Sequence, residues 1–204
     1  IYFLEKPGAQ TIAVDFREIK DAHSDTLFDL EFSPDGQQIA SCAADRFAKV
    51  HQVVDGLFVR AFEGHTHHVM GVSWRADGRM LATSGADKAV KVWNAQTGDQ
   101  TKTITGWKKE VTAIKFVSTG DDMITSAGDP QVSMRDTNGG NKGGFGGPSD
   151  FVYTARVSAD GKTFASGGES SIVRVWNAQK QPVASFEPPK PEAPEEDADQ
   201  QAAN

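Results

Sequence analysis

Hydrophobic positions in this chain alternate with small or polar ones over short stretches. In "VMGVSW", residues 69–74, Met70, Val72 and Trp74 are bulky and the residues between them are small. A period of two indicates a β-strand with one buried face. Similar stretches, rich in β-branched and aromatic residues and separated by turn signals, fill most of the chain. The sequence therefore predicts an all-β fold.

This strand pattern recurs at a fixed interval. The turns "SPDG", "RADG", "VSTG" and "SADG" end at Gly36, Gly78, Gly120 and Gly161, at intervals of 42, 42 and 41 residues. Each interval holds up to four short strands, which we call a to d in chain order. Such a unit predicts a four-stranded antiparallel meander. Two further series share the period: His23, His65, Trp107 and Ser149, and His51, Trp93, Arg135 and Trp176.

Strand a has one bulky and one small face. Its small face carries, at the middle position, Asp29, Gly71, Ala113 and Thr154. A sheet of this kind can stack on a copy of itself, because bulky side chains fill the space that small ones leave. Four strands per repeat of about this length are typical of a β-propeller blade.

These landmarks resemble the WD40 (Trp-Asp) repeat family, in particular the C-terminal portion of a bacterial-type member. The resemblance rests on "GH" at Gly64 and His65, on "SPDG" at residues 33–36, and on "WN", "RD" and "WN" at Trp93, Arg135 and Trp176. It covers about residues 1–186. It implies a β-propeller with four full repeats, at about 21–62, 63–104, 105–146 and 147–186.

The chain is expected to form an incomplete ring. Tyr2 takes the tryptophan position of a preceding repeat, so residues 1–20 are interpreted as a partial leading blade. Because WD40 propellers typically close with seven blades, we expect unpaired strand edges at both ends. Upstream sequence or another chain would then supply the missing blades. The acidic, Pro-rich segment 187–204 is predicted to be disordered.

The resemblance also implies that four residues of the second repeat lock their blade through hydrogen bonds. They are His65, Thr83, Asp87 and Trp93. A metal site at His65, His67 and His68 is the alternative, but no further ligand pair stands at metal spacing. We therefore expect no metal ion. The other repeats keep parts of the lock: His23, Ser41 and Asp45, then Thr125 and Asp129, then Ser166 and Trp176.

The connection at residues 138–149, "NGGNKGGFGGPS", resembles a phosphate-binding loop only superficially, since no Gly-Lys-Ser/Thr follows. We interpret it as a flexible connection in which strand d shrinks to a few residues around Phe145.

Charge and cysteine content narrow the range of ligands and cofactors that this protein could bind. The formal net charge is −7, and most of it lies in the last 18 residues. A body so nearly neutral argues against nucleic acid as a ligand, and no apolar run is long enough to span a membrane. Cys42 is the only cysteine, so neither a cysteine-type metal site nor a Cys-x-x-Cys-His haem motif is present. We expect no cofactor.

Two classes of function remain. The first is a non-catalytic scaffold that binds a protein partner of acidic character. The alternative is an accessory propeller domain of a larger redox or hydrolytic enzyme, for example one joined to a c-type cytochrome domain. No catalytic residues are expected, because every Ser-His-Asp set that could be assembled uses residues already assigned to turns or to the hydrogen-bonded locks. The compartment stays open: cytoplasmic by default, periplasmic if a cytochrome domain is attached. The candidate partner-binding residues are Arg46, Phe47, His67, His68, Lys88, Trp107, Lys108 and Lys109.

Overall fold

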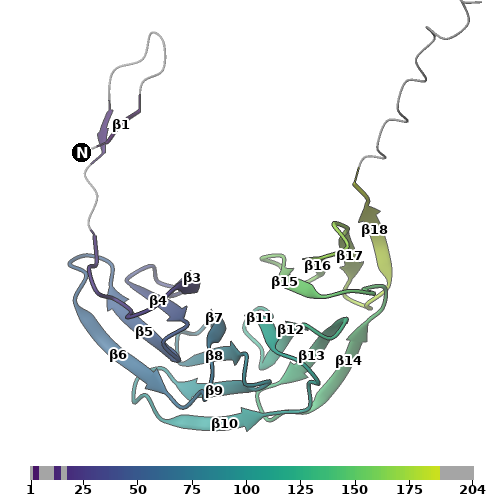
Figure 1. Cartoon of the computed structure of the whole chain (residues 1–204), viewed down its shortest axis with the longest axis horizontal. Coiled ribbons are helices and arrows are strands. Elements are labelled where there is room, and N and C mark those ends of the chain that lie inside the picture. Colours follow the sequence, from purple (N-terminus) through teal and green to yellow (C-terminus); the bar gives the residue numbers. More distant parts are fainter. Residues whose placement is uncertain (1, 5–11, 15–17, 189–204) are drawn as a thin grey trace, which may run out of the picture.

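Four antiparallel sheets of four strands each make up the body of the molecule (Figure 1). The computed structural model describes residues 2–4, 12–14 and 18–188. This part of the chain contains strands and turns but no helix, and hence no helix long and apolar enough to cross a membrane. The predicted all-β fold is confirmed. Of the acidic tail only Glu187 and Pro188 lie within the described residues.

Each sheet is a meander whose strands follow one another in chain order, and we number these blades 1 to 4. Blade 1 contains β3 (Leu27–Phe32), β4 (Gln38–Ala43), β5 (Phe47–Gln52) and β6 (Phe58–Glu63). Blade 2 contains β7 (Val69–Trp74), β8 (Met80–Gly85), β9 (Val90–Asn94) and β10 (Gln100–Ile104). Blade 3 contains β11 (Val111–Phe116), β12 (Asp122–Ala127), β13 (Gln131–Asp136) and β14 (Asn141–Phe145). Blade 4 contains β15 (Val152–Val157), β16 (Thr163–Gly168), β17 (Val173–Asn177) and β18 (Pro182–Phe186).

The Gly-rich connection of the third repeat differs from the sequence-based expectation. It contains a complete strand, β14, which pairs with β13 through Val132 opposite Phe145 and Ser133 opposite Gly144. Strand d of blade 3 is therefore not reduced. Glycines are poor strand formers, but backbone pairing with β13 and burial of Phe145, 4% exposed, hold this strand in the sheet.

Near the start of the chain, β1 (Tyr2–Leu4) pairs antiparallel with β2 (Ile12–Val14). Figure 1 draws this hairpin apart from blade 1. The sequence assigns strands c and d of a partial leading blade to this region, and the remainder of residues 1–17 lies outside the described part of the chain.

The blades stack face to face around an arc, with β3, β7, β11 and β15 innermost (Figure 1). We call the face that carries the strand c tryptophan position the leading face, and the opposite one the trailing face. Trp74 and Trp93, on the leading face of blade 2, share one buried cluster with Cys42 and Phe62 of the trailing face of blade 1. Phe62 meets the Trp93 ring edge-on at 5.6 Å between centroids. Two equivalent clusters join blade 2 to blade 3 and blade 3 to blade 4.

The innermost strands approach one another closely. A Cβ atom added at Gly71 would lie 2.7 Å from the Ser84 hydroxyl and 3.2 Å from the Cα atom of Ala113 in the next blade. The small middle position of strand a therefore lets β7 and β11 come together. This contact brings the strands into the arc that Figure 1 shows.

Two ion pairs cross the inside of the arc between blades that are not neighbours. Lys115 of blade 3 lies 2.5 Å from the carboxylate of Glu31 in blade 1. Arg156 of blade 4 lies 3.8 Å from that of Asp29, also in blade 1. Each pair joins strands that are two or three blades apart.

The ring is open, and its two ends expose sheet faces. Blades contact each other through their faces, and every blade keeps its own two edge strands, so the two ends of the arc differ from its middle by an uncovered sheet face. On the leading face of blade 1, Leu27, Leu30 and Phe32 are 51–56% exposed. The residues at corresponding places in blade 2, Val69, Val72 and Trp74, are at most 5% exposed.

The trailing face of blade 4 is exposed in the same way. Val173 and Phe186 are 45% and 61% exposed, and their counterparts in blade 1, Ala48 and Phe62, are 1% exposed. Side chains that a neighbouring blade buries elsewhere in the molecule are therefore open to solvent at both ends of the arc.

Candidate functional site

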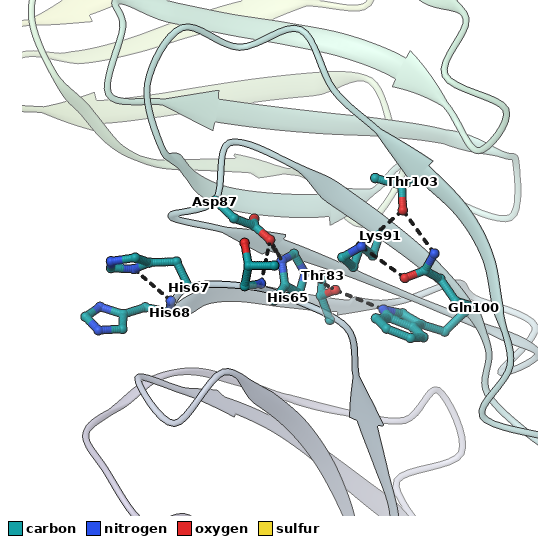
Figure 2. A network of polar contacts seen from close by, with 10 residues as sticks. His65, His67, His68, Thr83, Asp87, Lys91, Gln100 and Thr103 are labelled. Carbon is teal, nitrogen blue, oxygen red and sulfur yellow. Dashed lines mark hydrogen bonds and ion pairs between the residues drawn. The ribbon is translucent and has the colours of Figure 1, made fainter.

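Four side chains of blade 2 form one continuous chain of hydrogen bonds (Figure 2). The His65 Nδ1 atom lies 2.9 Å from both carboxylate oxygens of Asp87, and its Nε2 atom lies 2.8 Å from the Thr83 hydroxyl. The Trp93 indole N–H donates to that hydroxyl at 2.9 Å. The loop between β6 and β7, the turn between β8 and β9, and strands β8 and β9 supply these residues, so the chain ties both connections at one end of the blade to its sheet.

The positions of the protons in this series of hydrogen bonds follow from which atoms can donate and which can accept. Because the indole can only donate, the Thr83 oxygen accepts from Trp93, and its own proton is free to go to Nε2 of His65. We therefore assign the His65 proton to Nδ1, from which it is donated to Asp87. Burial raises the pKa of Asp87, but the bond from His65 and the backbone N–H of Thr66 outweigh burial and lower it overall. Both ring nitrogens of His65 are thus used within the fold.

The two histidines that follow point elsewhere. Figure 2 shows His67 and His68 turned away from Asp87. The backbone N–H of His68 donates to Nδ1 of His67 at 2.9 Å, and the His68 ring stacks on Phe28 of blade 1 at 5.8 Å. Among the described residues no group of three His, Cys, Asp or Glu side chains is arranged to hold a metal ion.

Blade 1 has the same arrangement up to the hydroxyl. Nδ1 of His23 lies 2.9 and 3.1 Å from the oxygens of Asp45, and Nε2 lies 2.9 Å from the Ser41 hydroxyl. His51 replaces the tryptophan, is 5% exposed, and packs edge-on against Phe58. Burial is the main cause that lowers the pKa of both His23 and His51.

Blade 3 uses a different pair at the two positions. The Arg135 guanidinium lies over the Trp107 ring, 4.6 Å from its centroid. Thr125 shares a hydrogen bond of 3.0 Å with Ser133. Asp129 accepts only a weak bond from the backbone N–H of Lys108, at 3.4 Å. Three buried atoms of blade 3 have no hydrogen-bond partner among the described residues: Nε1 of Trp107, Nε of Arg135 and Oδ1 of Asp129.

Blade 4 fastens its tryptophan to the preceding blade. The Trp176 indole N–H donates to the carbonyl oxygen of Gly146 at 3.0 Å, at the end of blade 3. Ser166, at the hydroxyl position, is buried at 4% exposed. Ser170, at the aspartate position, accepts a bond from Arg174 at 3.2 Å. In blade 4 a carbonyl oxygen of the Gly-rich connection thus accepts the indole hydrogen bond, whereas in blade 2 the Thr83 hydroxyl accepts it.

The repeats match a known family. The WD40 family, described as WD domain, G-beta repeat, matches residues 16–52, 56–94 and 141–177, which together make up more than half of the chain. The chain belongs to the WD40 repeat family. No curated protein matches it significantly. The unmatched interval contains β11 to β13, where Trp107 and Arg135 replace the WD40 histidine and tryptophan. Blade 3 therefore departs from the family pattern at both of these positions.

The b–c turns and d–a loops lie at one end of the blades, because strands of a meander alternate in direction. We call this end the loop face; it holds Arg46, Phe47, His67, His68, Lys88, Lys108 and Lys109. Arg46 and Lys88 have positive φ angles of 73° and 64°. Non-Gly residues rarely adopt this conformation. Ser171, at the equivalent turn of blade 4, also has a positive φ of 57°, so the conformation belongs to this turn of the repeat. Arg46 and Lys88 are exposed, and neither forms an ion pair within the described part of the chain.

Trp107 does not belong to this surface. It is 6% exposed and lies in the cluster between blades 2 and 3. The prediction that Trp107 is a partner-binding residue is therefore wrong. The other candidates are reachable. Lys108 and Lys109 are exposed, and Lys109 lies 6.0 Å from the centre of the Phe151 ring. A groove of about 260 Å³ between blades 1 and 2 is lined by Arg46, Phe47, Glu63, Gly64 and His65.

Sequence reasoning placed Trp107 and Arg135 in the histidine and tryptophan series of the repeat but did not predict that they contact each other. It also did not consider Ser133, which bonds to Thr125. The signal was present, because both substitutions fall at positions that meet in blade 2. A cation at one position and an indole at the other form a favourable pair.

Proposed function

We propose that this protein is a non-catalytic scaffold that binds an acidic segment of a partner protein on its loop face. WD40 domains commonly serve as protein-interaction scaffolds and are generally non-catalytic. The observation that carries the proposal is the pair Arg46 and Lys88, two exposed cations at equivalent turns of neighbouring blades. Both are exposed, and neither forms an ion pair with a described residue.

The aspartates beside these cations do not neutralise them. Asp45 precedes Arg46 and Asp87 precedes Lys88, but each carboxylate is bound to the histidine of its blade. Burial raises the pKa of Asp45, yet bonds from the backbone of Phe47 and from His23 lower it overall, so it is a bound anion at neutral pH. The locks thus keep the acidic partners of the turn inward and the cations outward.

Neighbouring groups extend the surface. Phe47 is half-buried beside Arg46, and Lys108 and Lys109 add two exposed cations on blade 3. An aromatic next to several cations suits a segment with acidic and apolar residues, since arginine and aromatic side chains are frequent interface anchors. Charge complementarity at such a rim mainly raises the association rate and makes it salt-dependent.

We also propose that further blades, from upstream sequence or from another chain, cover the two exposed ends of the arc. The apolar side chains Leu27, Leu30 and Phe32 at one end and Val173 and Phe186 at the other support this. Exposed apolar patches on sheet faces of this kind mark interaction surfaces.

A peptide array of defined net charge tests the binding proposal. Binding of the purified protein should favour acidic peptides and weaken between 50 and 300 mM salt by roughly tenfold, as expected for exposed charges. The double variant Arg46→Glu, Lys88→Glu should lose this preference. Lys102→Glu, at an exposed lysine of β10 away from the loop face, is the matched control and should bind as the parent does. Binding without charge preference, or an equal loss in the control, would overturn the proposal.

A further inference from the structure

A groove at the junction of blades 3 and 4 is independent of the loop face cations. It has a volume of about 530 Å³ and is lined by β17 and β18 and by the glycines that follow β14. Arg174 and Lys180 are the charged residues in its lining, and no acidic residue lines it. Val175, Trp176, Pro182, Val183 and Ala184 form apolar walls around them, and Val183 is 64% exposed.

Both cations lack a carboxylate. Arg174 donates to the Ser170 hydroxyl at 3.2 Å, and Lys180 donates to the carbonyl oxygen of Lys142 and lies 5.7 Å from the centre of the Phe145 ring. Neither forms an ion pair with a described residue. Two unneutralised cations beside apolar walls suit an acidic segment that also carries apolar or prolyl residues.

Such a segment continues directly from the groove. Ser185 of β18 lines the groove, and residues 189–204 begin four positions later. This segment carries five acidic residues against Lys190 and includes three prolines. An extended chain spans about 3.4 Å per residue, so the acidic stretch 192–199 is long enough to return to either cation.

We propose that the acidic segment 189–204 folds back along β18 and occupies this groove of the same chain, with its carboxylates against Arg174 and Lys180. Exposed ion pairs are individually weak, but attachment to β18 gives the segment an effective concentration of about millimolar. The same segment as a free peptide would therefore bind poorly. An interaction with a millimolar dissociation constant fills a substantial fraction of the grooves only when the segment is tethered to the same chain.

Paramagnetic broadening of amide signals in the full chain tests this. A nitroxide is attached at Ala198→Cys; Cys42 is fully buried and burial raises the pKa of its thiol, so it stays unlabelled. The amide signals of Gly147 and Val183 should lose at least half their intensity. The tail variant Glu195→Gln, Glu196→Gln, Asp197→Asn cannot disturb the sheets, and it should recover most of that intensity, as should 0.5 M salt.

Two further samples identify the occupant. Arg174→Gln with Lys180→Gln should remove the broadening, whereas Lys162→Gln, at an exposed lysine of blade 4 outside the groove, should leave it unchanged. Mixing isotope-labelled chain without nitroxide with unlabelled chain that carries it should give no broadening. Broadening in the mixed sample would assign the groove to a second copy and overturn the proposal. Equal broadening with the neutralised tail would show mere proximity and would overturn it too.

Discussion

The Arg135 guanidinium lies 4.6 Å from the centre of the Trp107 ring, at the two positions that tryptophan and histidine hold in blade 2. One blade of the stack has thus exchanged a hydrogen-bonded lock for a cation–π contact. The exchange leaves Nε1 of Trp107 and Oδ1 of Asp129 buried without partners. Unpaired buried polar groups are costly, so blade 3 is held less firmly at this end than blade 2.

Restoring the family residues in blade 3 should repair it. Trp107→His leaves Arg135 without its ring, and Arg135→Trp leaves no room for the existing indole, so each single change should destabilise by about 1 to 2 kcal/mol. The double variant regains partners in Asp129 and Thr125. Urea unfolding should place it at or above the parent in stability, with a favourable coupling of at least about 1 kcal/mol. Additive losses would show that the two positions do not interact.

Removing the aspartate should matter more in blade 2 than in blade 3. Asp87 holds His65 at 2.9 Å and Thr66 at 3.1 Å, whereas Asp129 holds one backbone N–H at 3.4 Å. Asp87→Ala leaves a buried imidazole donor unpaired and should cost about 2 to 3 kcal/mol, while Asp129→Ala should cost below about 1 kcal/mol. Denaturation midpoints measure both. Equal shifts in the two variants would contradict the lock.

Acidification should weaken the fold in two steps. The pKa values of His23 and His51 are lowered in the folded state, so the unfolded chain binds protons first as the pH falls below 6.5. Stability is complete above that pH and declines beneath it. The lowered pKa values of Asp45 and Asp87 act the same way at lower pH: their contribution is present above about 4 and is lost as the pH falls through the folded values.

The variant His51→Phe isolates the first step. Phenylalanine keeps an aromatic ring against Phe58 and cannot be protonated. Its unfolding midpoint should therefore fall less between pH 7.5 and 5.5 than that of the parent, while the loss below pH 4 stays the same. An unchanged fall between pH 7.5 and 5.5 would exclude His51 as a source of the first step.

The ion pair between Lys115 and Glu31 should help to set the curvature of the arc. It joins blades 1 and 3 directly, and both side chains are only partly exposed. Lys115→Glu places two carboxylates together and should increase the distance between blades 1 and 3, measured by energy transfer between dyes on the two blades. Lys115→Glu with Glu31→Lys restores opposite charges and should restore the distance. If the distance between blades 1 and 3 stayed large in the double variant, the ion pair would not set the curvature of the arc.

The four-stranded blades could be predicted because each strand a, b and c recurs with its own hydrophobic period, and tight turns leave one way to connect them. The reduction of strand d in blade 3 to a few residues around Phe145 was predicted wrongly, since Gly143 and Gly144 lack the side chains that identify a strand. Gly144 still pairs with Ser133 of β13, and Asn141 with Arg135. Whether a segment pairs as a strand depends on its neighbouring strand as well, so the composition of the Gly-rich segment alone could not predict the pairing.

The site was predictable to the extent that it repeats. His65, Thr83, Asp87 and Trp93 stand at fixed places in the repeat, and the structure joins them by hydrogen bonds. The burial of Trp107 could not be read in this way, because a tryptophan in a loop position fits either a contact surface or the core. Only the presence of Arg135 above its ring decides between them.

The protonation of His65 tests most directly the claim that these histidines fasten blades and perform no chemistry. Long-range nitrogen–proton NMR spectra at pH 7.5, with and without zinc, distinguish the two ring nitrogens. The account predicts that His65 and His23 carry the proton on Nδ1, and that zinc leaves both unchanged. A proton on Nε2 of His65, or a zinc-dependent shift of its signals, would contradict it.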